Sequence, residues 1–405
     1  MPHLRHRYLT PLVKKGLTHK GVVGIFGHRQ VGKTTLIEGI TNNYTTLDST
    51  IQRERANSSP ASFVSGLCEL PKSLPAAIDE CQLAPPLFPE IKEYIRTHKK
   101  PGQLILSGSV RFSSRKAIRE SLTGRMLSYE LLPFSISELE EKPINRLVLE
   151  LLHSKGFQSK DFASKKALGF ERHSLAKKYL TLGGLPGICF VRDSRDRKDL
   201  IESQLDLILD RDLRLVCETE VPLPQLRSLA RLIAQNQNKP LNFSEISRKS
   251  RISTPTLKKI IRGLESIFFV RILSTHGNES RPVVFLEDQG EATYLAQGTY
   301  DEIDDLERIC FAHIRVPLAY EPGLSFEIHQ YRQQGGAYLP FMVQSEGNVL
   351  GFMCSTEEKP SLGAIRSADS FKKNFPGAKV VHLHTGTRTE IIAPDEMTLP
   401  IELIF

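Results

Sequence analysis

The sequence has no tryptophan, no closely spaced cysteines and no long apolar segment. Its six cysteines are scattered and none forms a C-x-x-C pair, so we expect neither a structural zinc site nor a dithiol redox motif. No apolar run approaches the ~18 residues of a membrane span. The basic first residues also lack the apolar region of a secretory signal. These absences favour a reducing, cytoplasmic location without membrane contact.

The composition is that of an ordinary globular protein. The 405 residues are 40% hydrophobic and 25% charged, which excludes a disordered or collagen-like chain. At ~150 residues per domain, this length predicts two or three domains. The net charge of +8 is unevenly divided, because residues 222–275 carry +8, residues 276–405 carry −9 and the first 221 residues carry the rest. A basic middle attracts polyanions, whereas an acidic tail repels them.

A glycine-rich loop stands between an expected strand and an expected helix. Residues 27–34 read GHRQVGKT, which fits the P-loop pattern G-x-x-x-x-G-K-[ST]. The apolar run Val22–Phe26 before it predicts a buried strand, and TTLIEGI predicts the start of a helix. Main-chain amides at such a helix N-terminus bind phosphate. The residues expected to bind ATP are Gly27, His28, Arg29, Gln30, Val31, Gly32, Lys33, Thr34 and Thr35.

Two of these residues have specific expected roles, and an acidic pair further along the chain completes the site. We expect Lys33 to reach the β- and γ-phosphates and Thr34 to place its hydroxyl on Mg²⁺. In LPAAIDEC, Asp79 would hold Mg²⁺, largely through water, and Glu80 would orient and polarise the attacking water. The alternative is an acidic loop that merely follows a strand.

A third expected strand ends in small polar residues. QLILSGSV carries Ser109 near the strand end, where a hydroxyl can contact the γ-phosphate or the attacking water. A plain strand-to-loop turn is the alternative to this catalytic sensor role. Phosphoryl transfer also favours a cation at the γ-phosphate, and the candidates are Arg29, Arg111 and Arg125. Each could instead be a surface or structural arginine, but Arg125 lies in a loop from which it could reach a neighbouring subunit of a homo-oligomer.

The order of elements predicts an α/β fold for the first part of the chain. Strands expected near Ala76–Ile78 and Leu104–Leu106 flank a helix expected at Pro89–Thr97, which is typical of parallel β-α-β units. We therefore predict a P-loop NTPase parallel sheet in residues 1–140. A helical linker segment should follow in residues 141–221, with a long helix over Asp199–Val216.

The basic middle of the chain predicts a winged helix-turn-helix at residues 222–276. Helices are expected at Leu226–Gln235, Ser244–Lys249 and Thr254–Ile267, followed by a strand at Phe269–Leu273. The third helix carries Lys258, Lys259 and Arg262. These side chains could contact nucleic acid phosphates. The alternative is that the winged helix docks a protein client or acts as a lid.

Five motifs, taken in order, resemble a prokaryotic AAA+-type ATPase family. They are GHRQVGKTTL, AAIDECQ, LILSGSVRF, ESLTGRMLSYELLPFSISEL and YLTLGGLPG. The resemblance extends over about residues 5–275. It implies an ATPase core, a helical segment, a winged helix and a C-terminal domain of unknown function that is similar to restriction-endonuclease-like nucleases. We assign residues 277–405 to this α/β domain, for which the sequence predicts mainly strands and two helices.

The C-terminal domain departs from the nuclease pattern at the residues that would carry the chemistry. Pro340 stands where the resemblance implies a catalytic aspartate, and Met353 and Ser355 stand where it implies glutamate and lysine. Proline, methionine and serine cannot build a hydrolytic metal site. We therefore expect a degenerate nuclease-like domain without nuclease activity.

The sequence leaves four functions open. The leading one is a slow Mg²⁺-dependent ATPase that couples nucleotide state to the winged helix and a regulatory C-terminal domain. The second is a DNA-binding regulator or defence protein switched by ATP. The third is an interaction protein with a vestigial nucleotide site, which the intact set Lys33, Thr34, Asp79 and Glu80 disfavours. The fourth is an active nuclease, which the missing acids disfavour. Tyr129 and Phe134 are aromatic candidates for an adenine platform, and nothing in the sequence selects between them.

Overall fold

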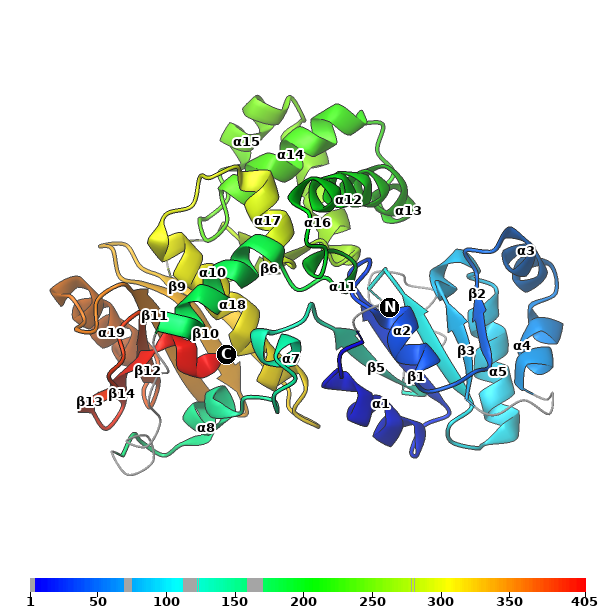
Figure 1. Cartoon of the computed structure of the whole chain (residues 1–405), viewed down its shortest axis with the longest axis horizontal. Helices are drawn as coiled ribbons and strands as arrows, with labels where there is room; N and C mark the ends of the chain where they lie inside the picture. Colours follow the sequence, from blue (N-terminus) through cyan, green and yellow to red (C-terminus); the bar gives the residue numbers. More distant parts are fainter. Residues whose placement is uncertain are drawn as a thin grey trace.

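The computed structural model describes residues 4–68, 75–111, 122, 124–158, 170–277, 279 and 281–405, with only the main chain of residues 170–173. Two β-sheets lie at opposite ends of the molecule, and a group of helices lies beside and between them (Figure 1). Among the described residues, no helix is long and apolar enough to cross a membrane.

Five parallel strands form the N-terminal sheet, in the order β2-β3-β4-β1-β5. Parallel strands place all their carboxyl ends at one edge of the sheet, where α/β proteins bind ligands. This sheet confirms the predicted α/β fold of a P-loop NTPase. The strands are β1 Val22–Gly27, β2 Tyr44–Thr46, β3 Ala76–Asp79, β4 Leu104–Gly108 and β5 Met126–Leu131.

Helices cover both faces of this sheet. Val23 and Ile25 of β1 share a core cluster with α1 and α2, whereas Val22 and Phe26 share another cluster with α4 and α5. This alternation follows from the period of two along a strand. The helices are α1 Leu9–Leu17, α2 Lys33–Glu38, α3 Thr50–Ser58, α4 Pro60–Cys68 and α5 Leu87–His98.

The next segment is helical, as predicted, but its longest helix contains a π-helical turn. The expected helix over Asp199–Val216 is a continuous run of α12, the π-helical turn η3 and α13. Helix α8 packs on the C-terminal sheet and α10 packs on α17. The elements are α7 Ile136–Leu139, α8 Leu147–His153, α10 Phe170–Leu182, α11 Pro186–Cys189, α12 Ser194–Asp206, η3 Leu207–Asp212 and α13 Leu213–Val216.

Three helices and a two-stranded antiparallel sheet follow. Strand β6 pairs with β8, so the predicted boundary between residues 276 and 277 falls between two paired strands. Helix α17 then packs against α10 and α14. The three helices and β6 lie where the sequence predicted them, and the winged-helix interpretation of the group stays a prediction. The elements are α14 Leu223–Gln235, α15 Phe243–Ser250, α16 Thr254–Ser266, β6 Val270–Leu273, β8 Val283–Leu286 and α17 Gln289–Ala296.

The C-terminal sheet has seven strands in the order β13-β14-β12-β11-β10-β9-β7 and is mixed. Helices α8 and α18 cover one face and α19 covers the other, and the nuclease-like interpretation stays a prediction. The strands are β7 Thr275–Gly277, β9 Glu327–Arg332, β10 Tyr338–Ser345, β11 Asn348–Ser355, β12 Lys379–His384, β13 Glu390–Ala393 and β14 Glu396–Pro400, and the helices are α18 Glu302–Ala319 and α19 Leu362–Asn374.

Candidate nucleotide site

The loop between β1 and α2 requires glycine at two of its positions. Gly32 precedes α2 with a φ of +97°, in the left-handed region that disfavours other residues. A Cβ at Gly27 would lie 2.5 Å from the carbonyl oxygen of Leu131 on the neighbouring strand β5. The two glycines of the P-loop pattern are therefore required by the backbone geometry. The main-chain amides of the loop lie at the carboxyl edge of the sheet.

Lys33 is buried at the start of α2. Its Nζ donates hydrogen bonds to the carbonyl oxygens of Gly27, at 3.1 Å, and His28, at 3.0 Å. Burial lowers the pKa of Lys33, and the nearby carboxylates of Glu80 and Asp79 oppose this shift. The ammonium group thus lies inside the curve of the loop, facing the acidic pair.

Asp79 gathers hydroxyl donors from three different elements. Its carboxylate accepts hydrogen bonds from Thr34 Oγ1 at 2.8 Å, Tyr44 OH at 2.7 Å and Ser107 Oγ at 2.5 Å. Burial alone would raise the pKa of Asp79, but these three hydrogen bonds and Lys33 together lower it. An ionised carboxylate beside the Thr34 hydroxyl is a pair of hard oxygen ligands of the kind that Mg²⁺ prefers.

Glu80 and Ser109 meet at the ends of neighbouring strands β3 and β4. Glu80 has a φ of +53° and a nearly buried side chain. Its Oε2 accepts hydrogen bonds from the Gln82 amide and, at 3.3 Å, from Ser109 Oγ. The same amide donates to Ser109 Oγ at 3.3 Å. The structure therefore brings the predicted catalytic glutamate and sensor serine together, through a glutamine that the sequence reasoning missed.

The side chains of the loop residues His28 and Arg29 face other parts of the chain. His28 Nε2 lies 3.2 Å from Glu291 Oε2 on α17, and Arg29 Nη1 lies 3.0 Å from Asp212 Oδ2 at the end of η3. These contacts leave the loop's main chain at the sheet edge, and they engage Arg29 in an ion pair. They join the phosphate loop directly to the helical segment.

The other two arginine candidates lie apart from the loop. Arg111 pairs with Glu130 at 2.9 Å and with Glu287 at 3.3 Å. Arg125 is exposed and immediately precedes β5, whose first residue pairs with Val22 at the opposite edge of the sheet from the loop. The structure does not bring Arg125 to the site, so its role as a finger in a neighbouring subunit stays a prediction.

A cavity of about 470 Å³ adjoins the first turn of α2. Arg7 lies between this cavity and the loop: its guanidinium stacks 4.2 Å from the centre of the Phe134 ring and donates to the Val31 carbonyl oxygen at 2.6 Å. The lining residues are Leu4, Arg5, His6, Arg7, Thr10, Gly32, Thr35, Leu36, Gly39, Phe134, Pro186, Gly187, Phe190 and Val191. Of the two aromatic candidates, only Phe134 lines this cavity.

Comparison with known families agrees with this geometry. Residues 19–140 match the model of a family described as an AAA domain, and residues 173–296 match one described as a domain of unknown function (DUF8612). The N-terminal domain is thus similar to AAA-type P-loop ATPases, as predicted. The second match spans α10 to α17, and therefore includes both partners of the phosphate loop, Asp212 and Glu291.

Individual relatives are distant. The uncharacterized protein Rv2008c of Mycobacterium tuberculosis is 24% identical over 376 residues, which cover 88% of this chain and 75% of that protein, and Mb2031c of Mycobacterium bovis matches equally. Among solved structures, the Walker-type ATPase PABY2304 of Pyrococcus abyssi is 14% identical, with 71% of this chain and 94% of that chain covered and a TM-score of 0.41. AMPPCP-bound DnaA from Aquifex aeolicus is 17% identical, with coverages of 63% and 86% and a TM-score of 0.25.

Proposed function

We propose that this protein binds ATP with Mg²⁺, hydrolyses it slowly and couples its nucleotide state to the helical segment and the C-terminal domain. The hydrogen bond of 2.8 Å between Thr34 and Asp79 is the main support. It places the hydroxyl of the loop helix and the acid of β3 together, beside the Lys33 ammonium. This arrangement of the Thr34 hydroxyl, the Asp79 carboxylate and the Lys33 ammonium disfavours a vestigial nucleotide site.

The metal site fits Mg²⁺ because it offers few protein ligands. Thr34 and Asp79 would hold the ion, which takes its remaining ligands from phosphate and water. In the described part of the chain no group of three or more His, Cys, Asp or Glu side chains could hold a metal by itself. When bound, the ion would neutralise charge on the β- and γ-phosphates.

The cavity beside Thr35 would take the nucleoside. Its volume of about 470 Å³ lies in the range of small-molecule pockets, ~300–1,000 Å³. Phe134 and Phe190 supply apolar ring surface, and the guanidiniums of Arg7 and Arg5 stack on these two rings. This places the base and ribose on one side of Gly32 and the triphosphate on the other.

Glu80 and Ser109 would act on the attacking water. A carboxylate can accept hydrogen bonds from water and orient it toward the γ-phosphate. Here Gln82 and Ser109 already occupy Glu80 Oε2, which favours slow turnover until that carboxylate is released. The ion pairs of His28 and Arg29 with α17 and η3 would carry movements of the loop to the helical segment.

The decisive experiment measures ATP binding by calorimetry with and without Mg²⁺. We expect the Lys33→Ala variant to lose at least ~10²-fold in affinity, because one charge-assisted contact to phosphate is worth a few kcal/mol. Lys20→Ala is the matched control, since Lys20 contacts Gly124 at the opposite edge of the sheet. Glu80→Gln should bind ATP normally but fail to hydrolyse it. Unchanged ATP affinity in Lys33→Ala would refute the site.

Exposed basic side chains support nucleic acid binding as a second candidate function. Arg248, Arg251, Lys258 and Arg262 are all exposed on α15, α16 and the turn between them. The opposite side of α16 packs closely on α13, because a Cβ at Gly263 would lie 2.8 Å from Leu213. The basic face is therefore the outer face of the helix pair.

A gel shift at several salt concentrations tests this candidate. Lys258→Glu with Arg262→Glu should weaken retention and flatten its salt dependence, because phosphate contacts release counterions. Lys14→Glu with Lys15→Glu makes the same change in charge on α1 and is the control. No retention of single- or double-stranded DNA at low salt would exclude this function.

A further inference from the structure

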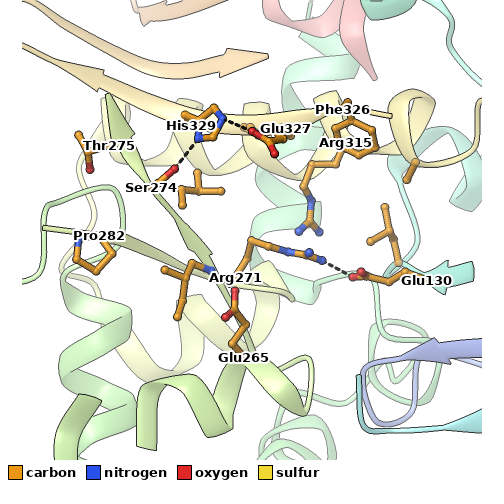
Figure 2. Close-up of a pocket in the computed structure, with 15 residues that line it drawn as sticks. Glu130, Glu265, Arg271, Ser274, Thr275, Pro282, Arg315, Phe326, Glu327 and His329 are labelled. Carbon is orange, nitrogen blue, oxygen red and sulfur yellow. Dashed lines mark hydrogen bonds and ion pairs between the residues drawn. The ribbon is translucent and has the colours of Figure 1, made fainter. Parts of the chain in front are cut away.

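A second cavity, of about 570 Å³, lies where three parts of the chain meet (Figure 2). The ATPase domain contributes the end of β5, the middle segment contributes α16 and β6, and the C-terminal domain contributes α18 and β9. Its lining residues are Glu130, Leu132, Glu265, Arg271, Ile272, Leu273, Ser274, Thr275, Pro282, Arg315, Ala319, Phe326, Glu327, Ile328 and His329.

The guanidinium of Arg315 is the distinctive group in this cavity. Its side chain is 6% exposed, and Nη2 pairs with Glu287 Oε2 at 2.7 Å. Nε and Nη1 have no hydrogen-bond partner among the residues that the structure places. Figure 2 shows the guanidinium pointing into the space between Phe326 and Arg271. Buried donors without partners are costly, so these two N–H groups favour an acceptor inside the cavity.

Arg315 belongs to a cluster of ion pairs at one wall of the cavity. Arg111, Arg271 and Arg315 pair with the carboxylates of Glu130 and Glu287. Each oxygen of these two carboxylates lies within ion-pair distance of an arginine, and Nε and Nη1 of Arg315 still have no acceptor among the described residues.

The other walls offer groups for a polar molecule. Ser274 and His329 are hydrogen-bonded at 2.5 Å across the cavity from Arg315, and the Phe326 ring forms part of the same lining. The remaining acids do not compete for Arg315: Glu265 Oε1 accepts a hydrogen bond from the Ile272 amide, and Glu327 pairs with His329 and is 73% exposed.

We propose that this cavity binds a small hydroxylated metabolite through a phosphate or carboxylate group held by Arg315. Both anions present the paired oxygens that match guanidinium N–H groups. The hydroxyl groups of the ligand would contact Ser274, His329 and the acids of the rim. Because the walls come from three parts of the chain, the bound ligand would stabilise their arrangement. The cavity is separate from the P-loop, so this proposal does not depend on whether the protein hydrolyses ATP.

Equilibrium dialysis with ribose 5-phosphate and with citrate tests this proposal at constant ionic strength. The Lys33→Ala variant is the background, so that the P-loop cannot account for phosphate binding. We expect saturable binding of at least one probe, and tighter binding of ribose 5-phosphate or of citrate identifies phosphate or carboxylate as the recognised group. Arg315→Gln should weaken that binding ~10-fold or more. Arg146→Gln, which removes an arginine paired with Glu321 outside the cavity, should not.

A second variant keeps the test valid if Arg315→Gln does not fold. Ala319 lines the cavity one helical turn after Arg315 on α18, so Ala319→Leu fills space without touching the charges. We expect it to abolish binding with little change in melting temperature. The proposal fails if neither probe binds saturably up to ~10 mM, or if binding survives unchanged in the variant that folds.

Discussion

His28 of the phosphate loop lies 3.2 Å from Glu291 of α17, and both side chains are almost fully buried. The other oxygen of Glu291 accepts a hydrogen bond from Gln204 of α12 at 2.7 Å. A loop position that is variable in the P-loop pattern is thus tied to two helices of the matched domain of unknown function. Movements of the loop would therefore act on this contact.

The contact should make stability depend on pH. Burial alone would lower the pKa of His28, but Glu291, together with the Arg29 carbonyl oxygen and Asp288, raises the pKa above the ordinary value of 6.5. A raised histidine pKa gives stability that is fully present below the unfolded value and lost as pH rises through the folded value. We expect His28→Gln to cost about 1–3 kcal/mol of unfolding free energy at pH 6 and clearly less at pH 9, measured by urea denaturation. Glu291→Gln should show the same trend, and an equal cost at both pH values would contradict the ion pair.

Arg29 should behave as a structural partner of Asp212. Because the two side chains are 3.0 Å apart and largely buried, a double-mutant cycle of Arg29→Ala and Asp212→Ala should give a coupling energy of about 1–3 kcal/mol in stability. ATP turnover per folded molecule should change by less than ~10-fold, since the guanidinium faces η3. A loss of ~10²-fold in turnover with unchanged stability would instead place Arg29 on the γ-phosphate.

Phe134 should contribute to binding of the nucleoside and not of the triphosphate. Phe134→Ala removes an apolar ring from the wall of the cavity beside Gly32, and burial of apolar surface against such a side chain is worth about 1.5–3 kcal/mol. ATP affinity should therefore fall ~10- to 100-fold, whereas inorganic tripolyphosphate should bind as before. Tyr94→Ala removes an aromatic ring that stacks on His98 of α5 and is the control. Equal losses for both ligands would mean that the loop itself is disturbed.

The parts of this molecule that the sequence predicts are those whose causes are local. The P-loop is recognised by glycine at fixed positions. A buried strand followed by acids is likewise recognised from residues that are adjacent in the sequence. Asp79 could therefore be placed, but its partner Tyr44 on β2 could not, because that contact depends on the order of the strands. Arg7 supports the loop from a position before α1, and no spacing rule links it to Val31 or Phe134.

Long-range pairing also crosses the predicted boundary in the middle of the chain. The sequence predicts that the winged helix-turn-helix ends at residue 276, because the pattern after Gly277 is mainly strands. The structure pairs β6 with β8 beyond that point. The segment Glu287–Glu291 then contacts both Arg111, which follows β4, and His28, in the loop. Those contacts join residues far apart in the sequence, and no local sequence pattern predicts them.

Glu307 of α18 should lower stability at neutral and higher pH. It is buried, and Tyr338 OH donates to both of its oxygens at 3.0 and 2.9 Å. Burial raises the pKa of Glu307 to about 8. The folded protein therefore binds a proton that the unfolded chain releases above its ordinary value of 4.5, so stability falls as pH rises between these two values. Glu307→Gln removes this charge and keeps the shape, so its stability relative to the parent should increase from pH 5 to pH 8 in urea denaturation. Glu302→Gln, at the exposed start of the same helix, should show no such trend, and a flat difference for Glu307→Gln would mean that the buried carboxyl is already ionised at pH 5.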